Sequence, residues 1–323
     1  QKLLADQPAG TLATTAVFYD TLRHDIRKSF RHVVEGVERV ERIYGADSAH
    51  ARVAKSVAVL QLLDDFPTNR ENIAALLHPS ADAGSQLATV KAAVDEMLAD
   101  KEVHLSEIDG RLRFMSEAVS EMEGERAKIH AGPRETRLVL HDKLKQIFTP
   151  APTVRLLGTR SVTTGIKAMS GTLAISLDGE REPVQTAIEF VPAGNYEKTK
   201  EERILDSNQR ANLNCLYLLA KEDPEIDNKL VEIVRSIGIY NQNRNKTVEK
   251  EVSEYLNGQF QRAESLGNEL EALLKKQLAA GSFIFRGKPV AVGVLHADLL
   301  QATGKQLETA AKEVFEKYAE APV

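Results

Sequence analysis

The chain of 323 residues contains no tryptophan, a single cysteine and few aromatic side chains, which make up 5% of the residues. So few aromatics argue against a surface on which the bases of single-stranded nucleic acid stack. The lone Cys215 excludes a disulfide framework within the chain, which suits a reducing cytosol. No apolar run is long enough to span a membrane, and the first residues lack the apolar segment of a signal peptide. We therefore expect a cytoplasmic protein with no membrane partner.

Charge of neither sign dominates the sequence. The formal net charge is -5, and 28% of the residues are charged and 42% hydrophobic, as in ordinary globular proteins. This balance gives no general attraction to nucleic acid or to an anionic membrane. The length allows two or more domains. The sequence starts at Gln1 instead of methionine, so we expect a fragment cut from a larger protein.

Residues 51–115 are the most informative segment, because they predict three short helices followed by a two-stranded hairpin. Apolar residues spaced by three and four predict the helices at 51–64, 68–77 and 85–100. The run Thr68-Asn-Arg-Glu71 predicts a capping box at the start of the second helix. Asp109-Gly110 predicts the turn of the hairpin. This order of elements is typical of a winged helix-turn-helix module. A similar apolar repeat predicts one long helix over 11–44, ended by Gly45.

The rest of the chain predicts a small mixed sheet and a long helix. Short alternating segments at 154–157, 162–169, 172–177, 185–191 and 215–219 predict strands, and Pro224 predicts a helix start. Residues 247–280 predict a long helix whose apolar seam (Val248, Val252, Tyr255, Gln259, Ala263, Leu266, Leu270 and Leu273) contains a stutter. We expect an antiparallel coiled-coil arm, for which the helices of 116–148 are a candidate partner. A second hairpin around Arg286-Gly287 and a helix over 297–318 close the chain. The predicted fold class is α+β, mostly helical.

The sequence shows no constellation that predicts catalysis, a cofactor site or a metal site. The stretch from Gly158 to Lys167 looks like a phosphate-binding loop, but its glycine spacing is too long and Ile166 separates Gly165 from the lysine. We expect β-turns and a strand there. The eight histidines are scattered and none has metal-site spacing. Cys215 lies on a predicted strand, so we expect a buried side chain and no nucleophile.

Charge allows two interpretations of the three-helix segment. The exposed face of its third helix carries Gln86, Lys91, Asp95, Glu96 and Asp100, and its acidic second half should repel phosphates. The hairpin offers three residues that could contact DNA, Lys101, Arg111 and Arg113, although Glu102, Glu107 and Asp109 offset them. A protein-docking module is the favoured interpretation, and a DNA-binding module is the alternative.

Two runs of this segment, residues 53–67 and 68–79, resemble the region after the ATPase core in the BrxC/PglY family. These are the large P-loop proteins of bacterial BREX phage-defence systems. Residues 109–114 and 281–289 are similar as well. The resemblance implies a bacterial cytoplasmic AAA+ ATPase that uses ATP and magnesium, oligomerises through its ATPase core and works with other BREX components, and with DNA. The chain has no Walker A motif, so the nucleotide site would lie upstream and no catalytic residue carries over.

The expected function is therefore a non-catalytic assembly and coupling region of a BREX ATPase, which docks partner proteins and transmits nucleotide-driven motion. Whether the chain is itself an enzyme stays open. The expected domains are a lid-type helix after the ATPase core (1–45), a winged helix (46–115), a helical linker or arm (116–150), a small α+β domain (151–240), the long helix of a coiled-coil arm (241–281), and a β-hairpin with a terminal helix (282–323).

Overall fold

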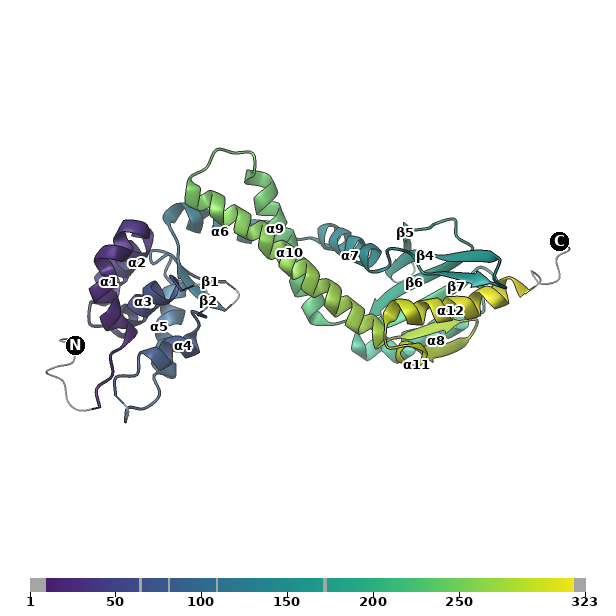
Figure 1. The fold of residues 1–323 in the computed structure, drawn as a ribbon, viewed down its shortest axis with the longest axis horizontal. Coiled ribbons are helices and arrows are strands. Elements are labelled where there is room, and N and C mark those ends of the chain that lie inside the picture. Colours follow the sequence, from purple (N-terminus) through teal and green to yellow (C-terminus); the bar gives the residue numbers. More distant parts are fainter. Residues whose placement is uncertain (1–9, 64–65, 81, 109, 171–172, 317–323) are drawn as a thin grey trace. The chain divides into compact units, whose positions relative to one another are not determined.

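The computed structural model of the chain describes residues 10–316, except for residues 64–65, 81, 109 and 171–172 (Figure 1). The fold is mixed α+β and mostly helical. The chain forms two compact units, which are described here one at a time. The first unit holds the residues up to Glu125 together with Val248–Tyr255. The second holds Arg126–Thr247 and the residues from Leu256 onward.

Two helices open the first unit, where the apolar repeat predicted one. α1 (Thr15–Ser29) and α2 (Arg31–Tyr44) are separated at Phe30, whose φ of -134° and ψ of 61° are not helical. The prediction of a single helix was wrong because both pieces bury the same apolar face, as Tyr19 and Val37 do, so the repeat continues across the break. The predicted end at Gly45 is confirmed, and this glycine has a φ of 94°.

Three further helices and a hairpin follow in the predicted order. They are α3 (Ala49–Leu60), α4 (Arg70–Leu76), α5 (Leu87–Ala99), β1 (Leu105–Ile108) and β2 (Arg111–Phe114). Ile108 pairs with Arg111, so the hairpin reverses at the predicted position, of which Asp109 lies outside the described residues and Gly110 has a φ of 73°. The Leu112 N–H donates to the Thr68 carbonyl at 2.8 Å, which joins the segment before α4 to the hairpin.

Asn69 caps the start of α4, and the predicted capping box at Thr68 was wrong. The Asn69 side chain accepts a hydrogen bond from the Asn72 N–H at 2.8 Å. Thr68 is buried, and its carbonyl is bound to the hairpin. Both residue types are good caps, and the sequence could not show that a long-range backbone contact fixes Thr68 one position outside the helix.

Replacing Asn69 by alanine is expected to lower the free energy of unfolding of the first unit by about 1 kcal/mol. The reason is that the N–H of Asn72 then loses its acceptor at the helix start. Urea unfolding followed by circular dichroism measures this difference. Asn69→Asp, which keeps an acceptor oxygen, is the matched control and should stay close to the native chain. Equal stability of all three proteins would contradict the cap.

A seven-stranded sheet forms the centre of the second unit. Its strands are β3 (Thr153–Leu156), β4 (Arg160–Ser170), β5 (Leu173–Asp178), β6 (Val184–Val191), β7 (Cys215–Lys221), β8 (Ser282–Phe285) and β9 (Lys288–Ala291). The strand order is β3-β4-β6-β7-β8-β9, and β5 pairs with the edge of β4 on which β3 also lies. β4, β6 and β7 are parallel, and the other pairs are antiparallel. The predicted hairpin around Arg286-Gly287 forms β8 and β9 and extends this sheet through β7.

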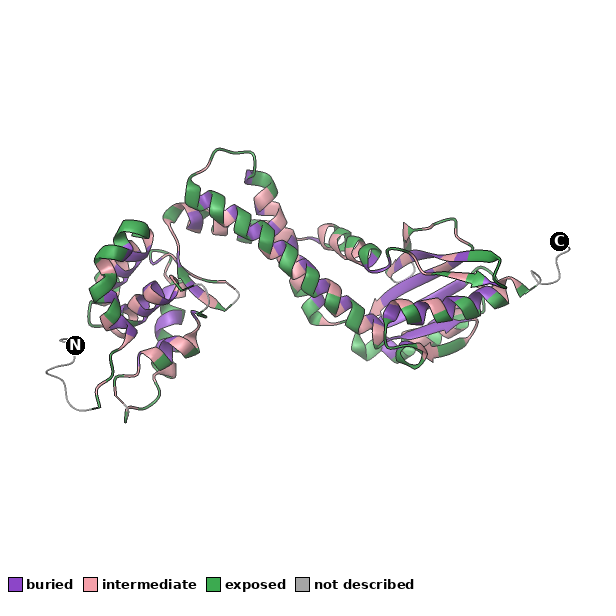
Figure 2. Cartoon of the chain, viewed as in Figure 1, coloured by how far each residue is buried: buried purple, intermediate pink, exposed green. Residues whose placement is uncertain are grey.

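Helices cover both faces of this sheet. On one face, Ile204 of α8 packs against β6 and β7, and on the other the cluster includes residues of α7, α9, α10 and α12. In Figure 2 the central strands are buried and the outer faces of the helices are exposed. The helices are α6 (Glu117–Lys128), α7 (Pro133–Ile147), α8 (Tyr196–Asp206), α9 (Pro224–Asn243), α10 (Lys250–Ala279), α11 (Val292–Leu295) and α12 (Leu299–Val314); α6 and α10 have residues in both units.

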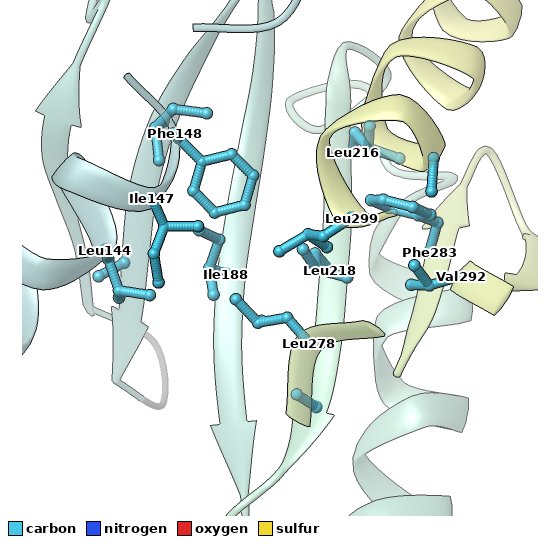
Figure 3. Packing of buried hydrophobic residues seen from close by; sticks show 14 of the residues in the cluster. Leu144, Ile147, Phe148, Ile188, Leu216, Leu218, Leu278, Phe283, Val292 and Leu299 are labelled. Carbon is cyan, nitrogen blue, oxygen red and sulfur yellow. The ribbon is translucent and has the colours of Figure 1, made fainter. Parts of the chain in front are cut away.

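The core of the second unit is built in rows across the strands. Ile188, Leu218 and Phe283 are direct neighbours on β6, β7 and β8, and all three are almost completely buried. Figure 3 shows them in the same cluster as Phe148, Leu278 and Leu299, which come from outside the strands. β7 buries both of its faces because helices lie on both sides of the sheet, so it is apolar at six successive positions.

The long helices α9 and α10 pack together in antiparallel orientation within the second unit. Lys229 pairs with Glu269, and Ser236 donates to Gln259 at 2.9 Å, so the positions rise along α9 as they fall along α10. The predicted seam of α10 holds at Val252, Gln259, Ala263 and Leu270. At Tyr255 and Leu273 the side chains are partly buried, Leu273 against the core of the second unit, and the neighbouring residues Leu256 and Leu274 are buried.

Candidate interaction site

The first unit has a shallow groove of about 670 Å³ between α4, α5 and the β1–β2 hairpin. We call it the α4–α5 groove. Its lining is polar and carries both signs of charge. The cations are Arg70, Lys91 and Arg111, and the anions are Glu71, Asp95 and Glu107. The groove is therefore balanced in charge, unlike a site that attracts a polyanion.

Arg70 holds the three elements of the groove together. Its Nη1 is 2.5 Å from a Glu107 oxygen on β1, and its Nη2 is 2.8 Å from an Asp95 oxygen on α5. Burial lowers the pKa of Arg70, but the hydrogen bonds that it donates to Glu107 and Asp95 outweigh burial and leave that pKa above its ordinary value. The guanidinium stays charged and fixes the hairpin relative to α4 and α5. The sequence analysis assigned no role to Arg70, because its partners are distant in sequence.

The acidic residues of α5 are engaged with neighbours in the fold. Asp95 binds Arg70, and Glu96 lies 2.8 Å from the Nε2 of His50, whose ring stacks on Tyr44. Asp100 ends the helix and accepts a hydrogen bond from the Glu102 N–H. Asp95 and Glu96 remain exposed to solvent. These carboxylates occupy the face on which a helix that reads DNA needs hydrogen-bond donors.

The three basic residues predicted to contact DNA are close in sequence, but they do not all line the α4–α5 groove. Lys101 lies in the turn after α5. Arg111 and Arg113 are on the same face of β2, opposite the buried Leu112 and Phe114. Arg111 lines the α4–α5 groove, whereas Lys101 and Arg113 do not. Across the described part of the chain, no ion pair or side-chain hydrogen bond forms to any of the three.

The stretch that looks like a phosphate-binding loop is a β-turn followed by a strand, as predicted. Gly158, with a φ of 72°, lies between β3 and β4, and Lys167 lies within β4. Gly165 permits a close approach of backbone, because a Cβ there would lie 2.2 Å from the Gly179 carbonyl oxygen. This glycine therefore has a packing role.

The remaining candidate groups are the lone cysteine and the side chains that could bind a metal ion. Cys215 begins β7 and is buried, which raises the pKa of its thiol and confirms the prediction of a buried side chain. Among residues 10–316, outside the gaps given above, no group of three or more His, Cys, Asp and Glu side chains could hold a metal ion. Within the same residues, no helix is both long and apolar enough to cross a membrane.

Comparisons with known proteins found no match for this chain among protein-family models, curated proteins or solved structures.

Proposed function

We propose that this chain is an assembly and coupling region of a bacterial phage-defence ATPase of the BrxC/PglY type. Residues 53–79, 109–114 and 281–289, which resemble that family, support the proposal. We interpret α3, α4, α5 and the β1–β2 hairpin as a winged helix. The hydrogen bond from Leu112 to Thr68 supports this interpretation, since the segment before the second helix of such a module pairs with the hairpin.

The observation that carries the proposal is the balanced charge of the α4–α5 groove. DNA affinity depends mainly on cations that replace the counterions of phosphates. The lining of this groove has as many anionic as cationic side chains, and Arg70 is already bound by two carboxylates. A protein segment with both acidic and basic side chains fits this arrangement better than a phosphate backbone, because complementary charges favour specific protein contacts.

The antiparallel pair α9 and α10 is the proposed coupling element, as a coiled-coil arm. Its seam includes the buried Gln259, which accepts a hydrogen bond from Ser236 of α9, and Arg262 of α10 pairs with Glu232 of α9 at 3.0 Å. A polar contact in an apolar seam fixes the register of two helices at some cost in stability. An arm of fixed register can transmit motion along its length without sliding.

The test is a binding measurement of the chain against the other purified BREX components. Lys91→Glu, in the groove and about half exposed, should weaken capture of the docking partner about tenfold, or ~1.4 kcal/mol. Arg113→Glu, outside the groove, is the matched control and should leave capture unchanged. If no component binds, or if Lys91→Glu binds as well as the native chain, the docking proposal is wrong.

A second candidate function, binding to the DNA backbone, is favoured by Lys101, Arg111 and Arg113, which have no partner among the described residues. Three phosphate contacts predict that the logarithm of the affinity falls with the logarithm of the salt concentration with a slope of about -3. The double variant Arg111→Glu, Arg113→Glu should abolish this binding. Absence of binding to duplex DNA at low ionic strength would exclude the function.

A further inference from the structure

Among the described residues, β5 lies on an edge of the seven-stranded sheet beside β4, and its ladder with β4 shifts register at Leu177. Within the described residues, β5 pairs only with β4, and its backbone makes no other hydrogen bond to the main chain (Figure 1). In an antiparallel ladder every second residue of an edge strand directs its N–H and C=O outward. An edge of this kind is a template for pairing with another strand.

The two edges of the sheet differ in how they resist such pairing. At the far edge, β9 has four residues and contains Lys288 and Pro289, a charge and a residue that cannot donate to a ladder. β5 is longer, and from Leu173 to Leu177 it has no charged residue, no proline and no glycine. A bulge is another such protection, and β5 has one at its end, where Ser176 pairs with Lys167 and Asp178 with Ile166. Between Leu173 and Ser176 the ladder is regular and carries none of these protections.

The large apolar residues of β5 all lie on one face of the strand. Leu173, Ile175 and Leu177 alternate with Ala174 and Ser176, and Leu177 packs against the core of the second unit. Leu173 is 54% exposed. The helix that packs on β5, α7, also carries an exposed leucine, Leu138, at 58%. The apolar side of this edge therefore continues past the core into solvent.

The sequence of β5 is complementary to itself in antiparallel orientation. Residues directly opposite each other in an antiparallel pair lie on the same face of the sheet. When two copies are paired with Ile175 opposite Ile175, Leu173 lies opposite Leu177 on the apolar face, and Ala174 lies opposite Ser176 on the other. No like charges meet between residues 173 and 177, and each leucine or isoleucine of one strand meets a leucine or isoleucine of the other.

We propose that two copies of this chain associate by antiparallel pairing of their β5 strands, which joins the two sheets into one across a two-fold axis. A second copy is the occupant that the edge fits, because a two-fold axis at Ile175 brings the large apolar residues of the two strands opposite each other. The site is separate from the α4–α5 groove, so the proposed function can fail without affecting it.

The experiment is sedimentation equilibrium of the whole chain over a wide range of concentration, with charge pairs designed for this register. The native chain should dimerise. Ala174→Lys with Ser176→Lys places like charges opposite each other twice, and should weaken dimerisation about tenfold or more. Ala174→Glu with Ser176→Glu should do the same. An equimolar mixture of these two double variants should form a heterodimer, because each introduced lysine then faces an introduced glutamate.

The substituted positions, Ala174 and Ser176, are exposed, so the variants should fold with unchanged circular dichroism. Ala291→Lys, an exposed substitution on the opposite edge strand β9, is the matched control and should dimerise like the native chain. A native chain that is monomeric at every concentration would overturn the proposal. So would a lysine double variant that dimerises normally, or a mixture that fails to form the heterodimer.

Discussion

Replacing Glu189 by alanine is expected to lower the free energy of unfolding of the second unit by about 3 kcal/mol. Glu189 lies on β6 and binds Arg203 of α8 through both oxygens, at 2.7 Å to Nε and 3.0 Å to Nη2. Both side chains are at most one-tenth exposed. Without the carboxylate, the guanidinium remains charged in the packed layer between α8 and the sheet, because an arginine side chain does not lose its proton in proteins.

The magnitude stays at the lower end of the range for broken buried pairs because Asp206 still holds Nη1 of Arg203 at 2.7 Å. Hydrogen exchange of the β6 and β7 amides measures the loss in this unit alone. The double variant Glu189→Leu, Arg203→Met should recover most of the stability, because it removes both charges together. If the double variant is no more stable than Glu189→Ala, the charge left behind is not the cause.

Replacing Leu218 by alanine is expected to cost about 4 kcal/mol, near the top of the range for such changes. Leu218 has no exposed surface and sits in the central strand, between Ile188 and Phe283. The cost of a cavity depends on how far its walls can close. Here two walls are neighbouring strands held at hydrogen-bonding distance, so they cannot move inward, and the void persists.

Urea unfolding together with hydrogen exchange on β7 gives the loss for Leu218→Ala. Leu138→Ala, which removes the same atoms from an exposed position on α7, is the matched control and should change stability by less than about 0.5 kcal/mol. A loss below about 2 kcal/mol for Leu218→Ala would mean that the sheet relaxes around the cavity and that its rows of side chains are not rigid.

Local signals in the sequence predicted most helices and strands, but they could not predict contacts between residues that are distant in sequence. The turns at Gly110 and Gly158 follow from residue types that tolerate a positive φ, and the strands follow from alternation. The break at Phe30 was missed because periodicity reports which face is buried and says nothing of continuity. The strand order was also beyond reach, since alternation shows that a strand pairs but does not show its neighbours.

The candidate site shows the same division. Arg111 was predicted as a contact residue and does line the α4–α5 groove, because a charged residue on a hairpin must face solvent. Arg70 was missed, since its partners Asp95 and Glu107 are brought to it only by the packing of α4, α5 and the hairpin. Glu189 was missed for a related reason. Its partner Arg203 lies in a helix whose sequence is almost entirely polar and predicts an exposed face.

The sheet has a consequence for the order in which the chain can fold during synthesis. β7 pairs with β8, yet residues 222–281 separate them in the sequence. A ribosome therefore releases β7, which is apolar from Cys215 to Ala220, well before the strand that covers its edge. Until then the nascent chain offers an unpaired apolar edge of the kind that aggregates or recruits chaperones. A chain truncated before Ser282 would lack β8, so the edge of β7 that β8 covers would stay unpaired.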